Sequence, residues 1–181
     1  MQRKLHTNGC IELASALNNL GYVLLHQDNL AEAETILRET VAMKGRLPAN
    51  EPAERSLSLN NLAKVFQLEG KLTEAETTYR EALARQRKRH GDDHLEVADA
   101  LNNLGYVLAQ QHKLAEARPL ADEAVAIFLR HPAQAGSSKL NDALRLLLTD
   151  LGDTAALGKL DLIRQRNAKP MPSPPPEPPA R

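Results

Sequence analysis

The sequence predicts an all-α solenoid built from stacked helical hairpins. A nine-residue block, ALNNLGYVL at 16–24, returns unchanged at 100–108, which is 84 positions later. A looser copy, SLNNLAKVF at 58–66, lies midway between them, so the period is 42 residues. A period of this size is typical of repeated supersecondary units that stack side by side. Such arrays present an extended surface, and that surface is usually what binds a partner.

The first helix of each repeat is indicated by its hydrophobic spacing. Apolar or small residues fall at i, i+3, i+4 and i+7, which is one face of a helix rather than a strand alternation. They are Leu17, Leu20, Gly21 and Leu24, then Leu59, Leu62, Ala63 and Phe66, and then Leu101, Leu104, Gly105 and Leu108. Gly21, Ala63 and Gly105 occupy the same position in the three repeats, which we call the small slot. Because only small residues occur there, we expect two helix backbones to approach closely at this position.

The second helix of each repeat follows a short polar turn. These turns are expected at 27–29, 69–71 and 111–113. The helices then open at Leu30, Leu72 and Leu114 with an acidic residue in the first turn, where the helix dipole favours it. A small slot recurs in them as Ala33, Ala75 and Ala117.

The periodicity divides the chain into repeats at 10–50, 51–93 and 94–132, followed by a weaker capping helix pair at 136–167. A proline-rich tail at 168–181 holds seven of the 11 prolines and is expected to be disordered. Residues 1–9 match the end of the second repeat in Gln2, Arg3, Lys4 and His6, and we interpret them as the remnant of a preceding repeat. The outer face of a helix at 11–26 would then lack a neighbour and be open to self-association.

Composition narrows the class of protein. The chain has 23 basic and 23 acidic residues, and this balance argues against RNA or DNA as a partner, because nucleic-acid binding needs a basic surface. The single cysteine, Cys10, cannot form an internal disulfide and fits a reducing compartment. We find no secretory signal and no run of about 18 apolar residues. The expected location is cytoplasmic, away from membranes.

The small-residue slots resemble those of the tetratricopeptide repeat, in Leu20-Gly21 with Ala33 and Leu104-Gly105 with Ala117. The LNNL blocks, the Glu-Ala-Glu triplets at 32–34 and 74–76 and the linker at 91–98 are similar to the 42-residue variety of kinesin light chains. The resemblance implies a right-handed superhelix in which the first helices line an inner groove. It also implies docking of peptides or protein segments, no enzymatic activity and no cofactor.

The paired asparagines are the leading candidates for groove contacts. They are Asn18 and Asn19, Asn60 and Asn61, and Asn102 and Asn103. Asparagine is a mediocre helix former, so six of them inside helices need a reason. Its amide can both donate and accept, which suits holding the main chain of an extended peptide. The alternative is that these amides bond to the neighbouring repeat and join adjacent helices.

Further candidates for the peptide-binding groove lie on the same face of the first helices. They are Tyr22, His26, Lys64, Gln67, Asp99, Tyr106 and Gln110. The two tyrosines suit an interface, although they could equally cover the core of a neighbouring helix. No cluster of Lys and Arg is present to clamp a C-terminal carboxylate.

Other motifs are weak. His90 and His94 flank Gly91-Asp92-Asp93, but this spacing is not that of a zinc site, so no metal is expected. The basic run 85–90 suits the C-terminus of a helix.

The function we favour is a non-catalytic scaffold that binds an extended peptide or partner segment. The alternative is a regulatory or sensor array split from a larger signalling protein.

Overall fold

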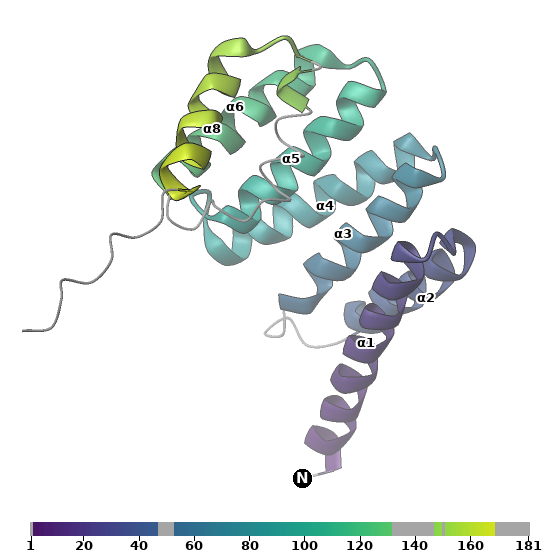
Figure 1. Ribbon diagram of the computed structural model, residues 1–181. Coiled ribbons are helices and arrows are strands. Elements are labelled where there is room, and N and C mark those ends of the chain that lie inside the picture. Colours follow the sequence, from purple (N-terminus) through teal and green to yellow (C-terminus); the bar gives the residue numbers. More distant parts are fainter. Residues whose placement is uncertain (1, 47–52, 132–146, 150, 169–181) are drawn as a thin grey trace, which may run out of the picture.

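The computed structural model describes residues 2–46, 53–131, 147–149 and 151–168, and every secondary-structure element in these ranges is helical. The tail and the first part of the capping pair lie outside them. The helices are α1 (Gln2–His26), α2 (Leu30–Gly45), α3 (Ala53–Leu68), α4 (Leu72–His90), α5 (Leu95–Gln110), α6 (Leu114–Arg130) and α8 (Thr154–Ala168). Figure 1 shows them as hairpins that follow one another through the solenoid, with α2 against α3 and α4 against α5.

The turns inside the hairpins are confirmed where the polar triplets predicted them. In each, the second turn residue has a positive φ: Asp28 (61°), Gly70 (76°) and His112 (60°). The next residue donates its amide back to the carbonyl five residues earlier, as in Lys71 N to Phe66 O at 2.8 Å. Gly152 (φ 66°) and the bond from Asp153 N to Leu148 O at 2.9 Å repeat this geometry. The turn before α8 is therefore of the same kind, despite the weak sequence pattern there, and we call the described residues 147–149 and 151–168 the fourth, or last, hairpin.

The small slot of the first helices accommodates a leucine side chain. A Cβ on Gly21 would lie 2.6 Å from Cγ of Leu37, and one on Gly105 would lie 2.8 Å from Cδ2 of Leu147. At Gly21 the nearest atoms therefore belong to the side chain of Leu37, whereas at Gly105 the backbone oxygen of Ala117 also lies within 3.6 Å of the added Cβ. In the third repeat the residue equivalent to Leu37 is Ala121, and Leu147 of the fourth hairpin supplies the missing bulk.

Helix α1 is longer than predicted. It begins at Gln2 rather than at residue 11 and runs without a break to His26 (Figure 1). At the equivalent junction between α4 and α5, Gly91 has φ 78° and ends α4. The residue 84 positions before Gly91 is Thr7, and a β-branched residue rarely adopts that conformation. The helix therefore continues through the junction.

The second helices α4 and α6 are joined by ion pairs between successive repeats. Arg80 reaches Glu116 at 3.0 Å and Arg87 reaches Glu123 at 2.7 Å, both from α4 to α6. Glu76 of α4 accepts from Lys113 and Arg80, and these bonds lower the pKa of Glu76 to about 2. Among the described helices, none combines the length and apolarity needed to cross a lipid bilayer.

Candidate functional site

The asparagine pairs lie on α1, α3 and α5, but equivalent members differ in exposure. Asn19 is exposed, and Asn61 and Asn103 are half-buried. Among the first members, Asn18 and Asn60 are half-buried, whereas Asn102 is only 1% exposed. The repeat therefore fixes the position of each asparagine without fixing its surroundings.

Asn18 takes part in a buried polar network that joins the first two repeats. Its Oδ1 accepts from Oγ of Ser58 at 2.8 Å and from Nδ2 of Asn61 at 3.3 Å. Nζ of Lys44, on α2, donates to the same Ser58 Oγ at 3.0 Å. The bonds link α1, α2 and α3, so for Asn18 and Asn61 they agree with the alternative in which the amides join adjacent helices. Neither Ser58 nor Lys44 was a sequence candidate. The signal was Ser58 itself, since the other two copies of the block have alanine at that position.

Asn102 requires a correction. As a groove residue its amide should be open to a ligand, but the side chain is buried, and neither of its amide atoms has a hydrogen-bond partner among the described residues. The burial agrees with position: α5 packs against α4 and α6, and Leu147 of the last hairpin also reaches it, whereas α1 packs against α2 and α3 alone among the described helices. We therefore leave Asn102 out of the proposed binding surface.

A second polar cluster joins α3 to α5. Nε2 of Gln67 donates to Oε1 of Gln110 at 2.8 Å, and Nζ of Lys64 donates to Oε1 of Gln67 at 3.2 Å. Gln67 is buried and positions its two neighbours, while Lys64 and Gln110 are exposed. The Lys64 side chain is exposed overall, but partial burial of its ammonium group lowers its pKa.

The remaining candidates fall into an exposed pair and two half-buried residues. The rings of Tyr22 and His26 meet edge to face with centroids 4.3 Å apart, and both side chains are exposed. Tyr106 is half-buried and packs against the core. Asp99 is half-buried as well, and burial, with a smaller contribution from the charge of Glu96, raises its pKa to about 7.

Comparison with known proteins gives the family. Two family models, both described as tetratricopeptide repeat, match residues 13–47 and 54–130. The chain belongs to the tetratricopeptide repeat family. None of the curated protein sequences compared with this tetratricopeptide repeat chain matches it significantly. The repeats of the family mediate interactions between proteins, and the fold is generally a non-catalytic scaffold.

Solved structures show the same fold at low sequence identity. BtubC (BKLC) of P. vanneervenii has a TM-score of 0.74 and 21% identity, over 93% of this tetratricopeptide repeat chain and 69% of that chain. A candidate kinesin light chain of Podosopora anserina with nearly identical TPR-like repeats has a TM-score of 0.65 and 19% identity, over 87% and 77%. A variant of that Podosopora anserina protein gives 0.67 and 20%, over 86% and 74%. The expected kinesin-light-chain-like type of solenoid is thereby supported at the level of the fold.

Proposed function

We propose that this chain binds an extended peptide or partner segment along the first helices α1, α3 and α5. One observation carries the proposal: Asn19, Asn61 and Asn103 recur every 42 residues on three successive first helices, and each keeps part of its side chain open. Amides at regular intervals suit the repeating donors and acceptors of a peptide main chain. The inner position of the first helices in this family supports the same surface.

The open side chains between the amides give this surface its selectivity. Tyr22 and Tyr106 offer apolar area with a polar tip, which suits anchoring a side chain of the partner. Lys64 contributes a positive charge, whereas Asp99 contributes a negative charge only as the pH rises through about 7, where its carboxyl group ionises. His26 and Gln110 lie at the ends of α1 and α5 and complete the set.

The test separates binding from stability. Peptides selected from a random display library on the full chain are measured against Asn19→Ala/Asn103→Ala, a double variant that leaves the Asn18–Asn61 bond intact. Loss of two hydrogen bonds should raise Kd about tenfold or more without changing the melting temperature. The matched control is Asn29→Ala, an exposed asparagine in the turn before α2. An unchanged Kd would contradict the proposal, as would a collapse in melting temperature. Adding Asn61→Ala should weaken binding further and also lower stability.

We also propose that the open face of α1 pairs with α1 of a second copy. Leu20 is 44% exposed, whereas its equivalents Leu62 and Leu104, which belong to the hydrophobic core, are 6% and 1% exposed. Leu13, Ala16, Leu20 and Val23 are all exposed, and their spacing of three, four and three residues matches the seam of a two-stranded coiled coil. Two such seams are self-complementary and can meet about a twofold axis.

Sedimentation equilibrium of the full chain tests this pairing. We expect a dimer that Leu20→Glu/Val23→Glu converts to a monomer, because the substitutions place charges in the seam. Leu57→Glu is the control, since Leu57 is an exposed leucine on α3, outside the seam. A wild-type chain that stays monomeric at high concentration would rule the pairing out.

Other parts of the function stay predictions. The regulatory or sensor alternative requires a ligand that changes the curvature of the array, and small-angle scattering with and without a selected peptide tests for such a change. The cytoplasmic location and the lack of catalysis are likewise expectations of the scaffold proposal.

A further inference from the structure

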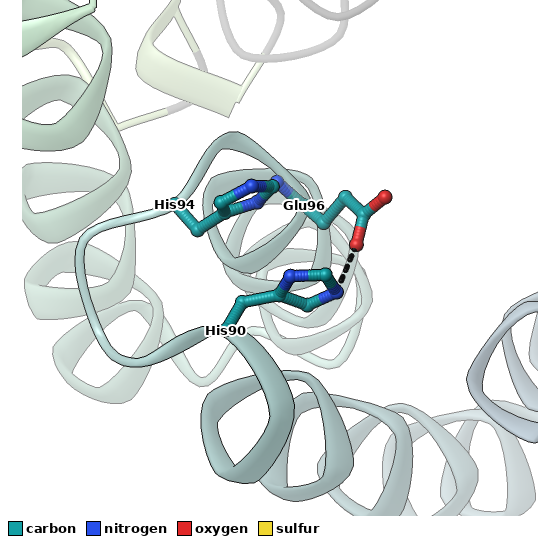
Figure 2. Close-up of side chains that lie close together, drawn as sticks. All are labelled: His90, His94 and Glu96. Atoms are coloured by element: carbon teal, nitrogen blue, oxygen red, sulfur yellow. Dashed lines mark hydrogen bonds and ion pairs between the residues drawn. The ribbon is translucent and has the colours of Figure 1, made fainter. Parts of the chain in front are cut away.

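The joint between α4 and α5 brings three side chains of metal-binding type together. His90 is the last residue of α4, His94 is the N-cap of α5, and Glu96 lies in the first turn of α5. Figure 2 shows the two imidazole rings stacked, with Glu96 beside them. The ring centroids are 4.3 Å apart with 23° between the planes, and Nε2 of His90 contacts Oε2 of Glu96 at 2.5 Å.

We propose that His90, His94 and Glu96 form a binding site for a divalent transition-metal ion of the zinc class. One ligand atom from each residue lies within 4.8 Å of the other two. Imidazole nitrogen and carboxylate oxygen are ligands that Zn²⁺ prefers, and three protein ligands leave a position for water or a partner's side chain. The two histidines are half-buried and Glu96 is exposed, so an ion can reach the site from solvent.

The backbone of the joint holds the three residues in place. Gly91 is the C-cap residue of α4, with φ 78° and ψ 176°, and its amide donates a hydrogen bond to the carbonyl of Arg87. His94 is extended (φ −140°, ψ 144°), and its Nδ1 accepts from the amide of Glu96 at 3.3 Å, which caps α5. The chain thus reverses between His90 and Glu96 and brings the end of one helix onto the start of the next. The spacing of the histidines did not indicate this site, because the third ligand, Glu96, lies outside the segment between His90 and His94.

Two charged residues of the joint, Arg87 and Asp93, are already paired, whereas the adjacent Lys88 and Arg89 are exposed cations that the ligands must outweigh. Arg87 pairs with Asp92 at 3.3 Å and with Glu123 at 2.7 Å. Asp93 pairs with Arg130 at 2.8 Å and lies 3.3 Å from Nε2 of His131. The C-terminus of α4 favours positive charge and the N-terminus of α5 favours negative charge, so the two helix ends offset each other and the carboxylate of Glu96 supplies the attraction for a cation.

Binding an ion would replace two contacts that exist without it. The ion would take the position between His90 and Glu96. The lone pairs of an imidazole lie in the plane of its ring, so those of two stacked rings run parallel and do not meet at one ion. One of the two imidazole rings would therefore have to rotate out of the stack. The bound ion would then tie the end of α4 to the start of α5. The consequence is a stiffer joint between the second and third repeats, whether or not a peptide is bound.

The experiment uses the untagged full chain carrying Cys10→Ser, because the exposed thiol of Cys10 would otherwise compete for metal. Zn²⁺ affinity is measured by competition with a chromophoric chelator, and Co²⁺ reports coordination through its visible absorption. We expect one ion per chain and a higher melting temperature with Zn²⁺ than with chelator. His90→Asn, His94→Asn and Glu96→Gln should each weaken Zn²⁺ binding by at least about tenfold and remove the Co²⁺ spectrum.

Two features of the design keep the result interpretable. Asparagine is a good N-cap, so His94→Asn removes the imidazole while α5 keeps a capping residue. His112→Asn is the matched control, because His112 is an exposed histidine in the turn between α5 and α6; it should bind Zn²⁺ as the parent does. Saturable binding absent up to about 100 μM Zn²⁺ would overturn the proposal. Equal binding by all four variants would overturn it too, since the ion would then be held elsewhere.

Discussion

Arg118 forms an ion pair with Asp153. The equivalent pairs in the preceding repeats are Glu34 with Lys71 and Glu76 with Lys113, so the signs of the two charges are exchanged in the last pair. The three distances are 2.7, 2.7 and 2.8 Å. Glu34, Glu76 and Arg118 are 42 residues apart, and Lys71, Lys113 and Asp153 each precede the second helix of the following hairpin. A last hairpin packed against α2 or α4 would place Asp153 beside a glutamate. The exchange therefore gives a small preference for packing the last hairpin after the third repeat, because like charges would meet at the other places.

A double-mutant cycle tests this exchanged pair. Arg118→Glu should lower the free energy of unfolding by about 0.5–1 kcal/mol, because the pair is partly exposed. Asp153→Lys should cost about 1–2 kcal/mol, since Oδ1 of Asp153 also accepts from the amide of Ala156 at 2.9 Å and caps α8. The double variant should recover about 0.5 kcal/mol relative to the sum of the two. Strict additivity in urea unfolding would show that the pair has no coupling.

The polar network around Ser58 predicts opposite effects at two equivalent positions. Ser58→Ala removes the hydroxyl that Lys44 and Asn18 share and should lower the free energy of unfolding by about 1–3 kcal/mol. One period later the alanine is already present at Ala100, and Oδ1 of Asn60 and Oε1 of Gln86 have no hydrogen-bond partner among the described residues.

Ala100→Ser should therefore raise the free energy of unfolding by about 0.5–1.5 kcal/mol. Chemical denaturation measures both variants, with the exposed Ala115→Ser on α6 as the control. If Ala100→Ser is destabilising, the second repeat interface is arranged differently from the first.

Asp99 should make the stability of the chain depend on pH near neutrality. Its pKa is about 7 in the folded chain against a reference value of 3.8. Between these values the folded state retains a proton that the unfolded state releases. The stabilising effect is complete below about pH 4 and is lost as the pH rises through 7.

Asp99→Asn stays neutral throughout, so it should raise the free energy of unfolding by about 1–3 kcal/mol at pH 8 and change it little at pH 4. Melting curves at the two pH values check this, with the exposed Asp122→Asn as the control. Equal effects at pH 4 and pH 8 would mean that Asp99 does not titrate in this range.

Leu147 should hold the last hairpin onto α5 through the slot at Gly105. Leu147→Ala removes a fully buried side chain and should cost about 2–5 kcal/mol. Gly105→Ala should cost about 1–3 kcal/mol by forcing Leu147 out of its position, even though alanine favours the helix. Because both changes act on one contact, the double variant should be clearly less destabilised than the sum. Thermal unfolding of the four proteins measures this coupling.

The sequence by itself determined the period, the hairpins and the ends of most helices. The polar triplets marked where α1, α3 and α5 end, because turn residues and helical hydrophobic spacing act over a few neighbouring positions. The start of α1 was missed although its cause, Thr7 in the place of Gly91, is also local.

Only the tertiary structure decided what each repeated side chain does. Asn18, Asn60 and Asn102 occupy one position in the repeat, yet the first bonds to Ser58 and the last is buried. Their environments depend on residues about 40 positions away, such as Ser58 and Ala100, and on the hairpin that follows. The same holds for Glu96, which joins His90 because the chain reverses at Gly91. Burial and polar partners come from packing between repeats, and a pattern within one repeat carries no information about them.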